Sequence, residues 1–259
     1  MVPLFEPPLI SKKTMSEKSS PAPLHRALVQ LFQGGPEDLW LVGGTALAGY
    51  YAEHRRSDDI DLFAGSPFTY QATVMNTRSL KKAGALFQRE TSSPAYYRAE
   101  LRFEGHPFTI DIVLDENLHH FGQATKTDDG IWVATPETLL ATKIACLVSR
   151  CSEKDLFDLS WLLPRAPHLT MKQFIELGNL VDGGLNIESL LISMQGARLR
   201  EEACHFLLPG DLTPKQAFHQ IEVLRKGLIQ KLMRHEAEQP LSADVKLLKK
   251  ALKEQKKLR

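Results

Sequence analysis

Two aspartates at alternate positions of a short apolar segment are the first residues whose spacing points to chemistry. Asp59 and Asp61 are interleaved with Ile60 and Leu62, a pattern that predicts a strand. Side chains two residues apart on a strand point to the same face, so the two carboxylates lie side by side. Their repulsion is costly unless a cation neutralises it, and Mg²⁺ prefers such oxygen ligands together with substrate phosphates. The alternative is a surface strand with alternating acids.

A third acid, Asp111, lies within the β-branched run of residues 109–113. A buried carboxylate without a partner is expensive there, so we expect this strand to lie beside that of Asp59 and Asp61. Three converging carboxylates can hold two Mg²⁺ ions, or Mn²⁺ in their place, about 3.5–4 Å apart for phosphoryl transfer. Asp111 would then bind the catalytic metal and help to deprotonate the attacking hydroxyl, and the other two acids would bridge both metals.

A glycine pair, Gly43-Gly44, follows the apolar residues 39–42 and precedes Thr45. Glycine lets a phosphate approach the backbone closely, and the start of a helix attracts anions. Thr45 can cap this helix or donate its hydroxyl to a phosphate. An ordinary turn after a strand is the alternative.

Basic and acidic residues of the helical segments form a second group of candidates. Lys143 falls on the apolar side of the helix predicted at 136–149, with Arg150 near the same line. Lysine is rarely buried without a partner, so Lys143 either reaches a triphosphate or extends from the edge of the apolar surface. Asp155, on the next helix, is expected to complement the helix dipole.

The elements that must position these residues indicate an α+β fold, a small mixed sheet followed by a helical part. We expect a poorly ordered leader at 1–23, rich in Pro, Ser and Lys, an α/β core at 24–134 and a helical domain at 135–259 that contributes to the active site. The predicted strands are 39–42, 60–63, 85–91, 96–103 and 108–114. The predicted helices are 24–32, 45–53, 70–82, 136–149, 153–163, 170–180, 187–195, 214–234 and 243–257.

The segment from Gly43 to Leu47, and then His54-Arg55-x-Ser57-x-Asp59-Ile60-Asp61-Leu62-Phe63, resembles the AbiEii-type nucleotidyltransferases of the DNA polymerase β-like superfamily. Lys143, Arg150 and residues 154–159 are similar to the helical motifs of that family. The resemblance implies nucleotide contacts by Gly43, Gly44, Thr45, Ser57, Lys143 and Arg150. It implies that Asp158 supports the site, for example by pairing with Lys143. Arg55 and Arg56 can contact phosphate or RNA, or be ordinary surface arginines.

The resemblance also implies a reaction and its partners. An NTP with Mg²⁺ would donate a nucleoside monophosphate to an acceptor hydroxyl, for which the 3′ end of tRNA is the family's analogy. The protein would be a toxin of a type IV toxin–antitoxin system with a cognate antitoxin protein. A small molecule or a protein is the alternative acceptor, and a catalytically silent nucleotide-binding protein is the alternative from another class.

Composition is compatible with this interpretation. The 259 residues carry a net charge of only +1, but from Lys215 onward twelve Lys and Arg face five Asp and Glu, a charge suited to RNA or to a solvated helix. Three cysteines without a CxxC, and no apolar run long enough for a membrane span, predict a cytoplasmic protein without a membrane partner.

Overall fold

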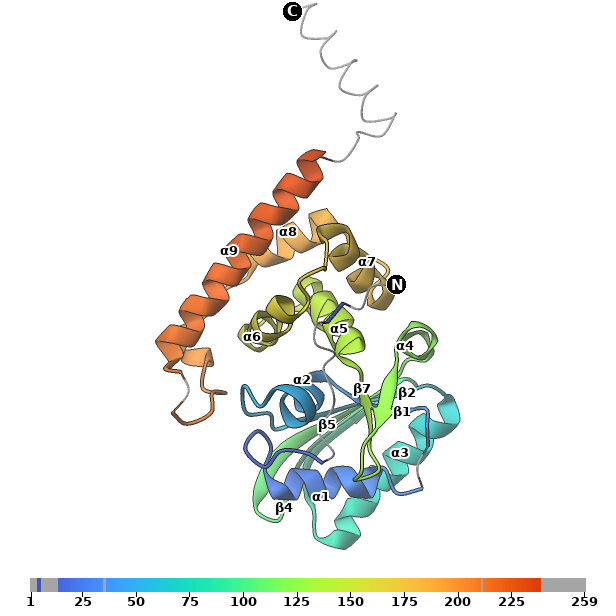
Figure 1. The fold of residues 1–259 in the computed structure, drawn as a ribbon. Coiled ribbons are helices and arrows are strands. Elements are labelled where there is room, and N and C mark those ends of the chain that lie inside the picture. The colour runs from blue at the N-terminus through green and yellow to red at the C-terminus, as the bar shows by residue number, and fades with distance from the viewer. Residues whose placement is uncertain (1–3, 6–13, 35, 211, 239–259) are drawn as a thin grey trace, which may run out of the picture.

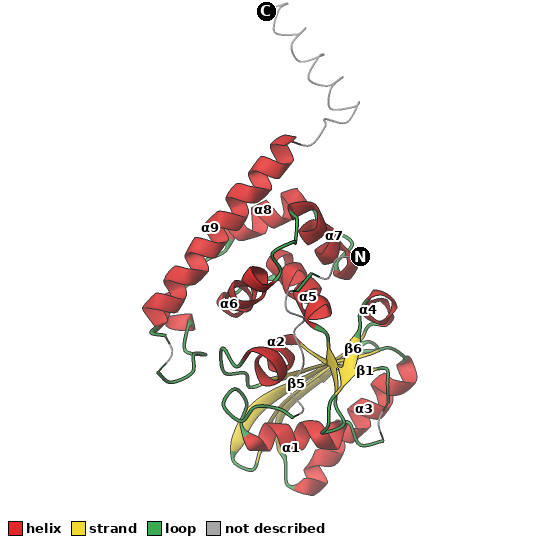
Figure 2. Ribbon diagram, in the orientation of Figure 1, coloured by secondary structure: helices red, strands yellow, loops and turns green. Residues whose placement is uncertain are grey.

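The computed structural model describes residues 4, 5, 14–34, 36–210 and 212–238. A twisted sheet has helices below one face and a cluster of helices above the other (Figures 1 and 2). The strands are β1 (Leu39–Val42), β2 (Asp59–Ala64), β3 (Leu86–Ser92), β4 (Tyr96–Phe103), β5 (His106–Leu114), β6 (Ala124–Lys126) and β7 (Trp132–Ala134). The longer helices are α1 (Ala22–Leu31), α3 (Pro67–Ser79), α5 (Pro136–Ser149), α6 (Glu153–Leu162), α7 (Met171–Val181), α8 (Ile187–Gly196) and α9 (Pro214–Glu238). Shorter ones are α2 (Gly43–Leu47), η1 (Ala48–Ala52), η2 (Leu80–Ala83), α4 (Glu116–Phe121), η3 (Leu163–Arg165) and η4 (Glu201–Ala203).

Within the described residues, seven strands form one mixed sheet in the order β3-β4-β5-β2-β1-β7-β6. β2 runs parallel to β5 and antiparallel to β1. The strand of Asp111 therefore lies directly beside the strand of Asp59 and Asp61, as the sequence predicts.

Alternation along β2 and β5 separates a core face from an open face. Ile60, Leu62, Ile110 and Ile112 are fully buried, and α1 and α3 pack against β5 below the sheet (Figure 1). The residues between them point to the opposite face, where α2 contacts β1, β2 and α5. The acids are thus directed toward the helices that follow the sheet.

Side-chain caps fix the starts of the two helices nearest this open face. Thr135 accepts a hydrogen bond from the backbone N–H of Thr138 and Pro136 occupies the first turn of α5, a position that suits proline. Ser152 caps α6 in the same way through Asp155. α5 packs against α6, α7 and α8, and α9 packs against α6 and α8. In the part of the chain that the structure describes, no helix is long and apolar enough to cross a membrane.

Several elements differ from expectation. The part of the 1–23 leader that is described is packed, because Phe5 and Met15 are buried in the core and the backbone N–H of Ser16 donates to Gly49. The helix expected at 45–53 continues from α2 into the π-helical turn η1. α4, β6 and β7 have no counterpart among the predicted elements. The helix expected at 243–257 lies outside the described residues.

Candidate active site

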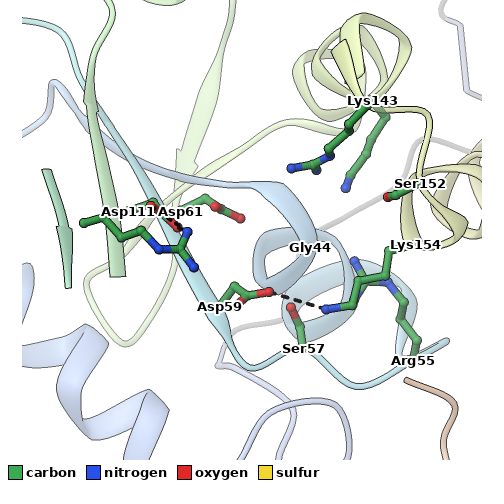
Figure 3. Close-up of a pocket in the computed structure, with 11 residues that line it drawn as sticks. Gly44, Arg55, Ser57, Asp59, Asp61, Asp111, Lys143, Ser152 and Lys154 are labelled. Atoms are coloured by element: carbon green, nitrogen blue, oxygen red, sulfur yellow. Dashed lines mark hydrogen bonds and ion pairs between the residues drawn. The ribbon is translucent and has the colours of Figure 1, made fainter. Parts of the chain in front are cut away.

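The strand register brings the three predicted acids to one cavity. Asp61 and Asp111 are Cα partners across β2 and β5, and Asp59 is the partner of Thr109. Laterally paired residues share a face of the sheet, so all three carboxylates face the same side. They line a cavity of about 310 Å³ together with Gly44, Arg55, Ser57, Arg98, Lys143, Arg150, Ser152 and Lys154 (Figure 3).

The two outer carboxylates have basic or hydroxyl partners. Asp111 accepts hydrogen bonds from Arg98 Nη1 at 2.9 and 3.2 Å and from the Tyr96 hydroxyl at 2.5 Å. Asp59 accepts from Thr109 Oγ1 at 2.8 Å, and its other oxygen lies 3.5 Å from Lys154 Nζ (Figure 3). As the side chains are placed here, no group of three or more His, Cys, Asp or Glu among the described residues has the arrangement of a formed metal site. The two strands lie side by side as predicted, and ion pairs hold the side chains of Asp59 and Asp111.

Asp61 differs from its two neighbours because, within the described part of the chain, it has no such partner at contact distance. Burial raises the pKa of its carboxyl to about 6, and the negative charges of Asp59 and Asp111 act in the same direction, against the opposing effect of Lys143. This carboxylate is thus the least neutralised of the three, as expected for like charges brought together.

The glycine pair makes room for side chains of the site. Gly43 has φ +70°, and a Cβ there would lie 2.0 Å from Asp61 Oδ2. A Cβ on Gly44 would lie 2.3 Å from Arg55 Nη2. Gly44 lines the cavity, whereas Gly43 and Thr45 are not among the lining residues. Thr45 is fully buried, and its hydroxyl donates to Ser57 Oγ and the carbonyl of Asp59. It ties the glycine turn to β2.

Replacing Gly43 by Ala is therefore expected to impair the site beyond the cost of its backbone conformation. The new methyl group would displace the Asp61 carboxylate, and a residue with a Cβ at positive φ costs about 1–3 kcal/mol. Gly84→Ala is the matched control, because Gly84 has φ +93° and a Cβ there would meet nothing within 4 Å. Both variants should lose stability in urea denaturation, but only Gly43→Ala should also lose most transferase activity. Equal activity in the two variants would show that the close approach to Asp61 is unimportant.

Basic side chains from the helical segment form the opposite wall of the cavity. Lys143 on α5, Arg150 at the end of α5 and Lys154 on α6 all line it. Lys143 is buried, with its Nζ 2.7 Å from Asp158 and 3.0 Å from Asp155. Burial alone would lower its pKa, but the two carboxylates raise it above the usual range. Arg150, 60% exposed, and Lys154, 42% exposed, are accessible to a ligand.

Asp158 lies at the centre of a fully buried charge cluster that links α6 to the segment before β2. It accepts from Arg55 Nε at 2.6 Å and Nη2 at 2.9 Å, and His54 Nε2 lies 2.8 Å from the same carboxylate. The expected pairing of Asp158 with Lys143 is present. The interpretation of Arg55 as a surface residue was wrong, since its side chain is only 2% exposed. Its place in the His54-Arg55-x-Ser57 motif was the signal available in the sequence.

Asp155 does more than complement the dipole of α6. It is fully buried, contacts Lys143, and receives Arg150 Nε at 2.7 Å and the Ser152 hydroxyl at 2.6 Å. It therefore orients both basic residues that the sequence assigned to nucleotide binding.

Comparison with solved structures identifies related folds. The nucleotidyltransferase toxin MenT4 of Mycobacterium tuberculosis superposes with a TM-score of 0.52 at 16% identity, over 84% of this chain and 82% of that one. JHP933 of Helicobacter pylori superposes with a TM-score of 0.48 at 17% identity, over 83% of this chain and 92% of that one. The superposition on MenT4 shows that the mixed sheet with its helical C-terminal part has the same fold as that protein, as the sequence predicts. A search of curated protein sequences gives no match.

A comparison with protein families matches residues 26–222 to the family described as nucleotidyl transferase AbiEii toxin of the type IV toxin–antitoxin system. The matched segment includes both sheet and helices and every side chain that lines the cavity. It also agrees with the resemblance of the glycine turn and the paired aspartates. The chain therefore belongs to the AbiEii family of nucleotidyltransferase toxins.

Proposed function

We propose that this protein is a Mg²⁺-dependent nucleotidyltransferase that transfers a nucleoside monophosphate from an NTP to a hydroxyl of RNA, with the 3′ end of tRNA as the acceptor. The family supports nucleotidyl transfer, a nucleotide substrate and an antitoxin partner. One observation carries the metal-dependent part of the assignment, and the RNA acceptor rests on the family resemblance. Three carboxylates of two adjacent strands face Lys143, Arg150 and Lys154 across a single cavity.

The donor set fits a divalent cation. Asp59, Asp61 and Asp111 supply only carboxylate oxygens, which are the ligands that Mg²⁺ and Mn²⁺ prefer. The pKa of Asp61 is raised first by burial and then by the negative charges of Asp59 and Asp111. Mg²⁺ held by these three residues would neutralise the phosphate oxygens and stabilise the charge that develops during transfer.

Side chains of the site then bind the triphosphate and accept the proton. Arg150 and Lys154 bind the β- and γ-phosphates, and the Gly44 backbone lets the triphosphate approach the sheet. Lys143, held by Asp155 and Asp158, supplies a fixed positive charge beside the α-phosphate. Asp111 accepts the proton of the acceptor hydroxyl, whose oxygen attacks the α-phosphorus. The bond from the α-phosphorus to the bridging oxygen breaks, and pyrophosphate leaves.

The proposal predicts that label from one or more α-³²P-labelled NTPs enters RNA when the protein is incubated with Mg²⁺ and total RNA. Chelation by EDTA should abolish incorporation, and added Mg²⁺ should restore it, because the cavity has too few positive charges for both acids and triphosphate. Gel separation of RNA from protein identifies the acceptor. Label that enters protein or a small molecule would contradict the RNA assignment but not the transferase. Incorporation that persists in EDTA would contradict the metal site.

A further inference from the structure

Beyond the strand of Asp111, the sheet continues with β4 and β3. The proposed chemistry does not use the side chains on this part of the sheet. Arg98 on β4 is the Cα partner of Asp111, and Thr91 on β3 is the partner of Arg98. Arg89 is in turn the partner of Glu100. Because laterally paired residues point to the same side, Arg89, Thr91 and Arg98 share a face with Asp111.

A second cavity opens on this face. It has a volume of about 160 Å³ and is lined by Arg89, Thr91, Tyr96, Arg98 and Glu100. Arg98 also lines the cavity of the acids, so the two hollows adjoin at one side chain. Two side chains that line the second cavity, Tyr96 and Arg98, contact Asp111.

The side chains of this cavity match a nucleic-acid strand. Among the described residues, Arg89 is exposed and has no hydrogen-bond or ion-pair partner. Arg98 is 40% exposed, and Tyr96 is 36% exposed. Guanidinium groups bind phosphate oxygens in a planar, two-pronged arrangement, and an aromatic ring stacks on any base. The single acid, Glu100, lies 3.7 Å from Arg98, which leaves the charge of Arg89 available.

The order of the strands shows where this face lies relative to the acids and the basic wall. From the sheet edge, β3 and β4 come first, then Asp111 on β5, then Asp59 and Asp61 on β2. The basic wall of α5 and α6 meets the acids from the other side, where Lys154 contacts Asp59. A triphosphate on that wall would leave the β4 side of Asp111 to the acceptor hydroxyl.

We propose that Arg89, Thr91, Tyr96 and Arg98, here called the acceptor platform, bind the phosphodiester backbone and a terminal base of a single-stranded RNA. The platform rests on the proposed function, because it positions the acceptor for the same reaction. Arg89 and Arg98 contact successive phosphates, and the ring of Tyr96 stacks on the base nearest Asp111.

The test is RNA binding measured without chemistry. A 5′-fluorescein-labelled single-stranded oligoribonucleotide is titrated with the protein in Mg²⁺ and no NTP, and anisotropy is followed at several salt concentrations. Arg89→Glu should weaken binding about tenfold and lower the slope of log K against log salt by about one, since a phosphate contact is lost. Tyr96→Ala should also bind more weakly, because the ring that stacks on the base is lost. The matched control is Lys82→Glu, which makes the same change of charge on an exposed residue of η2, outside the platform.

Each outcome decides the proposal. Equal RNA affinity and equal salt slope for the wild type, Arg89→Glu and Lys82→Glu would overturn it. A wild type that binds NTP by calorimetry and labels protein, but does not bind the oligoribonucleotide, would also overturn it and indicate a protein acceptor at this sheet edge. If the wild type does not bind NTP, the proposed function is contradicted. The RNA titration contains no NTP and would still show whether the platform binds RNA.

Discussion

Replacement of Asp61 by Asn is expected to abolish nucleotidyl transfer while leaving the fold at least as stable as the wild type. The amide has the shape of the carboxylate but no negative charge. Loss of one metal ligand removes several kcal/mol of transition-state stabilisation, or at least about a thousandfold in rate. The same change relieves repulsion from Asp59 and Asp111, which act with burial to raise the pKa of Asp61 to about 6. The melting temperature should therefore stay constant or rise.

Incorporation of labelled NTP and thermal unfolding followed by fluorescence measure these two effects. Asp58→Asn is the matched control, because Asp58 precedes the paired acids, is 43% exposed and contacts His106 at 3.1 Å without lining the cavity. Its activity should stay within about twofold of the wild type, as for other surface changes away from a site. A fully active Asp61→Asn protein would refute the carboxylate site.

Replacement of Asp158 by Asn is expected to cause the largest loss of stability, about 3–5 kcal/mol in the free energy of unfolding. The change leaves Arg55 and Lys143 buried without their shared countercharge, which is the costly way to break a buried ion pair. Lys143→Met should cost less, because Asp158 keeps both hydrogen bonds from Arg55. Urea denaturation measures both variants.

Glu176→Gln is the control for Asp158→Asn, since Glu176 belongs to an exposed pair with Lys172. Such pairs contribute little, and the change should stay within about 0.5 kcal/mol. If Asp158→Asn costs no more than this control, the buried cluster does not stabilise the fold.

The stabilising effect of Asp158 should also depend on pH in a defined direction. Burial alone would raise its pKa, but the charges of Arg55 and Lys143 hold it well below the ordinary range. A carboxyl with a depressed folded-state pKa contributes its full stability above the unfolded value of about 3.9 and loses it as the pH falls further. The stability difference between wild type and Asp158→Asn should accordingly shrink below about pH 4.

Strong local signals made much of the fold predictable. The strands at 39–42 and 96–103 and the helix at 136–149 have the predicted bounds, because apolar spacing and flanking Pro or Gly mark them clearly. β6 and β7 are three residues long, too short for a periodic pattern. They form because β7 pairs with β1 and β6 pairs with β7, which depends on the tertiary structure.

The parts of the site whose chemistry requires particular residue types could be predicted from the sequence. The hydrogen-bond and ion-pair partners that come from distant segments could not. Alternation along a strand was enough to place Asp59 and Asp61 on one face. The pairing of Arg55 with Asp158 spans 103 positions in the chain, and apart from the motif around Arg55 nothing local shows that its side chain is buried. The same holds for Arg98, whose contact with Asp111 follows from strand register. Composition likewise did not reveal that Phe5 and Met15, within the predicted leader, are buried.

The contact between Arg55 and Asp158 limits how this protein can be divided. Arg55 precedes β2, whereas Asp158 and Lys143 lie on helices after the last strand. The sheet portion taken alone would hold Arg55 without the carboxylate that pairs with it, and the helical portion would lose one of the two cations that contact Asp158. The sheet and the helices therefore cannot be exchanged independently between homologues by recombination, unless the incoming portion carries the complementary charges.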